Sequence, residues 1–289
     1  MNINPILKRE ITVQSRSLGL PLLVLTVNGL LFLAGLSGIF GLTARMRYGI
    51  GADYGDFLLL YALVLSLSFL LLLFVTPSLT AGSISGERAA KTLDIMLTTQ
   101  LGPAGIILGR LSASGAFFLT LLFSSIPPML LPLLYGGVSV FGVLGIWTVF
   151  ALTALLLLSV GIFASTLSGH TARTTAAAYG IVFGLCAGLP AICFFLAPFL
   201  GAGSRYMGVL LLLDPVFCVG KLLLWEIGRE QYFYQLMERL VFAENSAFLR
   251  YFVPLSLLAQ LSLSFILLVA AVLRITPRRR RQKPSREWS

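Results

Sequence analysis

Six long apolar runs, separated by polar segments, set the pattern of the chain. They cover residues 18–42, 57–76, 106–134, 138–167, 174–200 and 252–273. Each contains about 20 residues or more, the length with which an α-helix crosses the hydrocarbon core of a bilayer. Backbone groups in lipid must be paired internally, and these runs lack the alternation of membrane β-barrel strands. The pattern therefore predicts an all-α membrane protein with six transmembrane helices.

The composition agrees with a lipid bilayer as the solvent. Hydrophobic residues make up 57% of the 289 residues and charged residues only 11%, whereas soluble domains carry roughly 25% charge. A separate soluble domain needs about 100 residues, and no segment between the runs is that long. We expect one membrane domain over 18–275. The three cysteines show no spacing typical of a disulfide or metal framework.

The charges are distributed unequally between the two sides of the predicted membrane. If the N-terminus lies inside, 14 of the 21 basic residues and 4 of the 11 acidic residues fall on the inner side, so the whole net charge of +10 lies there. Basic residues are concentrated on the cytoplasmic side of membrane proteins. The pattern predicts a multi-pass protein of the cell membrane with both termini in the cytoplasm.

The polar segments outside the runs have three different characters. Residues 1–17 place apolar and basic side chains on opposite faces of a helix, which favours an amphipathic interfacial helix over a disordered basic tail. The tail 276–289 contains four consecutive arginines, and an anchor held by anionic membrane lipid explains them better than a nucleic-acid partner, which we do not expect. The outer loop 201–251 mixes aromatic residues with balanced charge. It predicts short helices at the outer interface, partly re-entrant.

The inner segment between the second and third runs contains helix signals. Ser85 and Gly86 can open a helix, and Glu87 with Lys91 forms an i,i+4 pair in the favourable orientation. An apolar face follows, made of Leu93, Met96 and Leu97. These signals predict a short helix at about 83–100, tied between two transmembrane helices. From the residues alone, two interpretations fit this helix equally well. One is a helix on which a soluble partner acts as on a lever, and the other is a surface helix that packs under the bundle.

Three motifs in and after this segment resemble the signature of ABC-2 type transporter permeases. They are GSISGER at 82–88, KTLDIMLTT at 91–99 and ILGR at 107–110. The opening NPILKRE at 4–10 is similar to the N-terminal interfacial helix of that family. Ala89, Gln100 and Arg110 depart from the residues that are usual in the family. Together with six spans and cytoplasmic termini, the similarity covers essentially the whole chain.

The resemblance implies an ABC-2, type V exporter-like fold in which the helix at 83–100 is a coupling helix. Such a helix docks on a separate ATP-binding subunit that holds the ATP and Mg²⁺, so that this chain needs no cofactor of its own. The positions implied as contacts or braces are Glu87, Arg88, Lys91, Thr92, Leu93, Asp94, Met96 and Leu97. The resemblance also implies a dimer with a second permease, identical or related. We expect alanine at Glu87 or Arg88 to uncouple transport while leaving the protein folded.

Glycines and prolines in the fifth run carry a further prediction. Gly180, Gly184 and Gly188 recur every four residues, a spacing that lets another helix approach closely. The neighbour is either a second protomer or another helix of the same chain. Pro190 is expected to bend the helix near the outer leaflet.

Two other functional classes were weighed against a permease. The chain has no Gly-x-x-x-x-Gly-Lys-Ser/Thr loop, and the single His170 has no nucleophile or acidic pair near it in the sequence, so we do not expect an enzyme acting alone. An ion-coupled carrier or channel is the serious alternative, but such proteins usually need ionisable groups within their spans. The six runs contain a single charged residue, Arg110.

The substrate of the predicted transporter is expected to be lipid-like, amphipathic or peptidic, and the direction to be export. This expectation comes from spans lined by apolar and aromatic side chains. The few polar points along them are Ser66, Ser68, Ser159 and Thr166.

Overall fold

The computed structural model describes residues 12, 18–48, 54–92, 102–128, 140–200, 207–241 and 246–276. Within these ranges the chain forms helices and turns and no β-strand. The all-α prediction is therefore confirmed for the described residues. The predicted interfacial helix at 1–17 and basic tail at 276–289 lie outside them, apart from Thr12 and Thr276.

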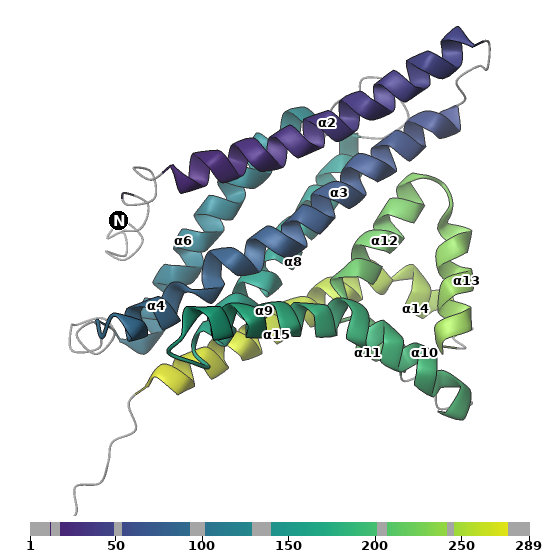
Figure 1. The fold of residues 1–289 in the computed structure, drawn as a ribbon. Helices are drawn as coiled ribbons and strands as arrows, with labels where there is room; N and C mark the ends of the chain where they lie inside the picture. Colours follow the sequence, from purple (N-terminus) through teal and green to yellow (C-terminus); the bar gives the residue numbers. More distant parts are fainter. Residues whose placement is uncertain are drawn as a thin grey trace, which may run out of the picture.

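Six helical segments of the described chain are long and apolar enough to cross a membrane. They are α2 (Gly19–Arg47), α3 (Tyr54–Ala81) with α4 (Ser83–Ala89), α6 (Pro103–Ser124), α8 (Val140–Ser165), α9 (Thr171–Phe183) with its continuation, and α15 (Phe252–Ile275). The six predicted spans are confirmed as helices of a multi-pass membrane protein. Figure 1 shows them as a bundle in which α2 and α3 run side by side and α15 lies on the opposite side.

The third span is described as far as Pro128. Helix α6 ends at Ser124 with Ser125 as its C-cap, but residues 126–128 are helical again, so the candidate span runs from Pro103 to Pro128. Residues 129–134 lie outside the described part of the chain.

Helix α8 is the centre of the bundle. It packs against α3 and α15 over the greatest length and also contacts α6, α9 and the shorter α12. Leu156, Leu157 and Val160 are completely buried in the largest hydrophobic cluster. The other helices therefore pack around α8, and these residues lie at the centre of the contact.

A glycine permits the close approach of α3 to α8. A Cβ atom at position 161 would overlap Thr80 Oγ1 and lie 3.0 Å from the carbonyl oxygen of Pro77. Pro77 lies inside α3, and Thr80 donates a hydrogen bond of 3.3 Å back to the Pro77 carbonyl. Only glycine fits between the two helices at this point.

The fifth helix changes its winding before Pro190. A π-helical turn, η1 (Gly184–Gly188), joins α9 to α10 (Leu189–Leu200). Proline lacks a backbone N–H and clashes with the carbonyl four residues earlier, which here belongs to Cys186. A π-turn relieves this conflict by shifting the hydrogen-bond register. The helix continues past Pro190 through this π-turn, and the expected bend stays a prediction.

Four short helices occupy the segment between the fifth and sixth spans, as expected for 201–251. They are α11 (Met207–Leu211), α12 (Pro215–Glu226), α13 (Glu230–Val241) and α14 (Ser246–Arg250). Helix α12 packs against α8 and α15, and its Cys218 and Val219 belong to the main core. Helix α13 packs on α12 and α10. The segment is therefore part of the bundle at its end remote from α4 (Figure 1).

Candidate functional site

The candidate site is the short helix α4 at one end of the bundle, where it continues the direction of α3 after Gly82. The first N–H groups of a helix have no partner within the helix. Here the N–H groups of Ile84 and Ser85 donate to the hydroxyl oxygen of Ser165, at 2.7 and 2.9 Å. Ser165 is the last residue of α8 and thus caps α4 from another helix. This cap fixes the start of α4 to the central helix.

A second polar contact joins α4 to α9. The hydroxyl groups of Ser85 and Thr174 lie 3.0 Å apart and share a hydrogen bond, and both side chains are buried. Arg88 reaches the turn between α8 and α9, where its guanidinium donates to the Thr166 carbonyl at 3.4 Å. The side chain of Arg88 also covers Gly169 in that turn. Both contacts tie α4 to the region where α9 begins.

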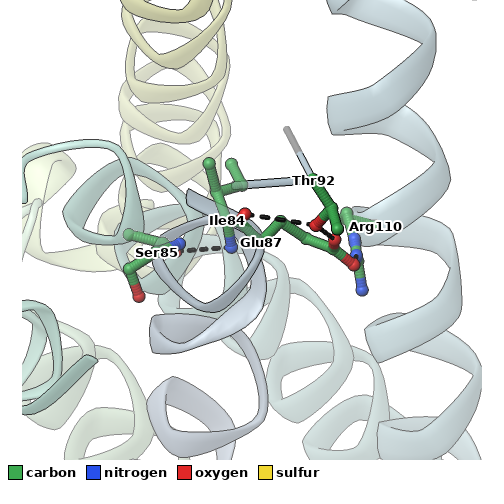
Figure 2. A network of polar contacts seen from close by, with 6 residues as sticks. Ile84, Ser85, Glu87, Thr92 and Arg110 are labelled. Carbon is green, nitrogen blue, oxygen red and sulfur yellow. Dashed lines mark hydrogen bonds and ion pairs between the residues drawn. The ribbon is translucent and has the colours of Figure 1, made fainter. Parts of the chain in front are cut away.

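An ion pair connects α4 to α6. The Arg110 guanidinium donates to Glu87 Oε1 at 2.7 Å, and the Thr92 hydroxyl donates to the other carboxylate oxygen (Figure 2). The two charged side chains are only 10% and 19% exposed, respectively. Charge-assisted hydrogen bonds between partly buried groups are stronger than exposed ones. Arg110, the single ionisable residue of the predicted spans, is therefore paired across two elements.

An apolar contact completes the seat of α4. Ile84 is 1% exposed and packs with Ile107, Ile162, Ala271 and Ile275. These partners come from the ends of α6, α8 and α15. Together with the polar contacts, this cluster packs α4 against α6, α8, α9 and α15.

The helix predicted over about 83–100 is interrupted at Lys91. Lys91 has a φ of 56°, and its N–H donates to the Arg88 carbonyl at 3.1 Å, while the Thr92 N–H donates to the Glu87 carbonyl at 3.0 Å. These two bonds define a Schellman C-cap, which normally carries glycine at the left-handed position. The expectation of one continuous helix, and with it the helical i,i+4 spacing of Glu87 and Lys91, is therefore wrong. Leu93, Asp94, Met96 and Leu97 lie outside the described residues.

Over the described residues 83–92, the outward side of the site is small and carries one positive charge, that of Lys91. Ala89, Ala90 and Lys91 are exposed, while Arg88 and Thr92 are half-buried. The predicted site residues thus divide into two groups. Glu87, Arg88 and Thr92 contact the bundle, and Lys91 faces outward.

The glycine series in the fifth span has no close neighbour among the described residues. A Cβ atom at Gly180, Gly184 or Gly188 would meet no atom within 4 Å, and Gly180 and Gly184 are exposed. The described part of the chain therefore shows no close packing of another helix at these glycines. Contact with a second protomer stays a prediction.

The polar points expected along a transport path are mostly closed off. Ser68, Ser159 and Thr166 are buried and donate to carbonyl groups of their own helices, at 2.7 Å in each case. Ser66 is exposed. A satisfied hydroxyl offers little to a substrate, so in this conformation these three residues do not form a polar path.

Sequence reasoning missed three partners that hold the site together: Arg110 as the partner of Glu87, and Ser165 and Thr174. One signal was present for the first, because a lone arginine in an apolar run needs a nearby carboxylate. Ser165 and Thr174 carry no such signal, since their roles depend on where α8 and α9 meet α4 in space.

The described residues contain no group of three or more His, Cys, Asp or Glu side chains placed to hold a metal ion. No protein-family model matches the chain, and no curated protein matches it significantly.

Proposed function

We propose that the chain is the membrane-spanning subunit of an ATP-driven transporter, energised by a separate ATP-binding subunit that docks on the outward side of α4. The observation that carries this proposal is how α4 is attached to the bundle. Polar contacts tie it to α6, α8 and α9, whereas Ala89, Ala90 and Lys91 are exposed. The resemblance of this segment to ABC-2 permeases supports the same reading.

Force applied to α4 reaches several helices at once. Displacement of Ala90 would move Ser85, which hydrogen-bonds to Ser165 and Thr174. It would also move Glu87, which forms an ion pair with Arg110. A short helix fixed at several points transmits displacement, because packed elements shift as units and do not deform continuously. Closure of the ATP-binding subunits would in this way change the arrangement of α6, α8 and α9.

The complete transporter would contain two permeases and two ATP-binding subunits in the cell membrane. The α4 end would face the cytoplasm, and ATP and Mg²⁺ would be bound by the partner subunits. Export of a lipid-like, amphipathic or peptide substrate agrees with predicted spans in which Arg110 is the single charged residue. The second permease, identical or related, would contact the glycine face of the fifth span.

The first test is copurification of the native complex. The full chain, tagged at its C-terminus, is extracted from native membranes in mild detergent, and the associated proteins are identified by mass spectrometry. We expect a stoichiometric soluble protein with a phosphate-binding loop, and we expect Ala90→Arg to reduce its recovery at least tenfold. Ala172→Arg is the matched control, since Ala172 is also an exposed alanine at the start of the neighbouring α9.

Retention of the ATPase by Ala90→Arg would place the docking surface elsewhere. A stable chain that never copurifies with a nucleotide-binding protein would contradict the proposal and favour an ion-coupled carrier or channel.

The structure changes the expectation for alanine at position 87. Glu87→Ala would remove the ion pair between Arg110 and Glu87, whose side chains are 10% and 19% exposed, and breaking a buried pair typically costs about 3 kcal/mol or more. We therefore no longer expect this variant to remain fully folded. Substitutions at exposed Ala90 or Lys91 separate docking from folding, and substitutions at Glu87 do not.

A further inference from the structure

A long groove lies between α6 and α8 on the outer surface of the bundle. Its walls are two stripes at helical spacing, each on one face of its helix. The groove is lined by Leu108, Leu111, Ser112, Gly115, Ala116, Phe118 and Leu119 of α6, and by Ala151, Ala154, Leu155 and Leu158 of α8. Both helices are candidate membrane spans, so the groove runs along the direction of the lipid chains.

Differences in side-chain size create the hollow. Gly115, Ala116 and Ala151 leave space in the middle, whereas Leu108 and Leu119 stand at the two ends, 56% and 44% exposed. A Cβ atom at Gly115 would meet no atom within 4 Å. Among the described residues, no neighbouring helix fills this space.

The chemistry of the lining restricts the occupant. The only side-chain polar group is the Ser112 hydroxyl, which donates to the carbonyls of Leu108 at 2.8 Å and Gly109 at 3.0 Å. A polar or charged ligand would find no free partner there and would lose its hydration. Only hydrocarbon fits such a lining without an energetic penalty.

The small exposed lining of the groove favours an acyl chain over a second protein helix. The groove follows α6 from Leu108 to Leu119, about 16 Å at 1.5 Å per residue, and has a cavity volume of about 640 Å³. The accessible lining is far smaller than the roughly 800 Å² that each partner contributes to a standard protein interface.

We propose that the α6/α8 groove is a binding site for an acyl chain of a bilayer phospholipid, lying parallel to the two helices. The bilayer supplies the occupant, since the groove opens sideways between two candidate spans. The small residues set the depth of the site, and the leucines at its ends retain the chain. The site requires only the membrane location and is independent of the proposed transport function.

The test uses the full chain reconstituted into phosphatidylcholine vesicles that contain a phosphatidylcholine with a diazirine midway along one acyl chain. After irradiation, adducts are mapped by peptide mass spectrometry. We expect adducts to concentrate on α6 and α8, and Gly115→Leu to reduce them there several-fold by filling the groove. Adducts on α2 should not change.

Gly29→Leu is the matched control. Gly29 is exposed on α2, and a Cβ atom there would also meet nothing within 4 Å, so this variant should leave the adduct pattern as in the wild type. Melting temperatures of the three proteins establish that all are folded. Equal labelling of every lipid-facing helix, or labelling of α6 and α8 unaffected by Gly115→Leu, would overturn the proposal. A disulfide between two chains through Ser112→Cys would overturn it too, because a protein helix would then occupy the groove.

Discussion

Asp214 is a fully buried carboxylate at the start of α12. Its Oδ1 atom accepts a hydrogen bond of 2.8 Å from the Val216 N–H, as an N-cap does. Its Oδ2 atom is buried without a hydrogen-bond partner in the described structure. Burial raises the pKa of Asp214 to about 7, against the opposing effect of the Val216 and Phe217 backbone N–H groups. At this residue folding therefore favours the protonated form.

This shift predicts a stability that falls as the pH rises. Between the ordinary aspartate pKa of about 4 and the folded value of about 7, the folded protein binds more protons at Asp214 than the unfolded chain does. The free energy of unfolding must then decrease across this window by up to a few kcal/mol and level off above it. We expect the melting temperature of the wild type in detergent to fall between pH 5 and pH 8, and that of Asp214→Asn to fall much less.

Glu238→Gln is the control for this experiment, because Glu238 is an exposed carboxylate on the neighbouring α13. It should retain the pH dependence of the wild type. The same slope in Asp214→Asn as in the wild type would mean that another group is responsible.

The residues that carry the candidate site differ in how far the sequence revealed them. Glu87, Arg88 and Thr92 were predicted from the resemblance, and each contacts another part of the site. The partner of Glu87 was wrongly expected to be Lys91, because local spacing suggested a helical pair. Its real partner, Arg110, is 23 positions away, and such a pairing depends on how α6 lies beside α4.

At the scale of elements, helix lengths were predictable because apolar length decides whether a segment crosses a bilayer. The positions of helix ends were not predictable from the sequence. The end of α4 depends on one lysine in the left-handed region, and the π-turn at Gly184–Gly188 depends on how the backbone accommodates Pro190. Such features involve one or two residues and leave the average hydropathy of the run unchanged.

The contact of α3 with α8 gives a prediction for an element pair. Gly161→Val would force side-chain atoms against Thr80 and the Pro77 carbonyl, and overpacking of a tight contact typically costs about 1–3 kcal/mol. We expect a clearly lower melting temperature, measured by following unfolding of the purified protein in detergent.

Gly145→Val serves as the matched control on the same helix, since a Cβ atom at Gly145 would meet nothing within 4 Å. Both variants introduce the same side chain into α8, so a difference between them reports the α3 contact alone. Equal melting temperatures of Gly161→Val and Gly145→Val would show that the contact between α3 and α8 accommodates valine without loss of stability.

At the scale of the whole molecule, one face of the fifth span meets no other helix within the described ranges. Gly180 and Gly184 are exposed there with open space above them, and Phe183, Phe194, Phe195 and Phe199 are exposed along the same continuous segment. Helices in lipid associate through small residues that allow close backbone contact, because the bilayer supplies no hydrophobic drive between them. A second copy of the chain would provide such a contact in the dimer proposed above.

Gly180→Leu tests this arrangement directly. A Cβ atom at Gly180 would meet no described atom within 4 Å, so the variant should fold normally, but its side chain would hold a second helix away from the glycine face. We expect dimerisation in detergent, measured by analytical ultracentrifugation, to weaken at least tenfold, which corresponds to about 1.4 kcal/mol or more. Gly41→Leu, at an exposed glycine of α2 with equally open space, should leave the dimer intact. A wild-type chain that stays monomeric at all concentrations would contradict a homodimer, and a Gly180→Leu dimer of unchanged strength would move the interface to another face, since leucine at this position cannot be accommodated in a close glycine contact.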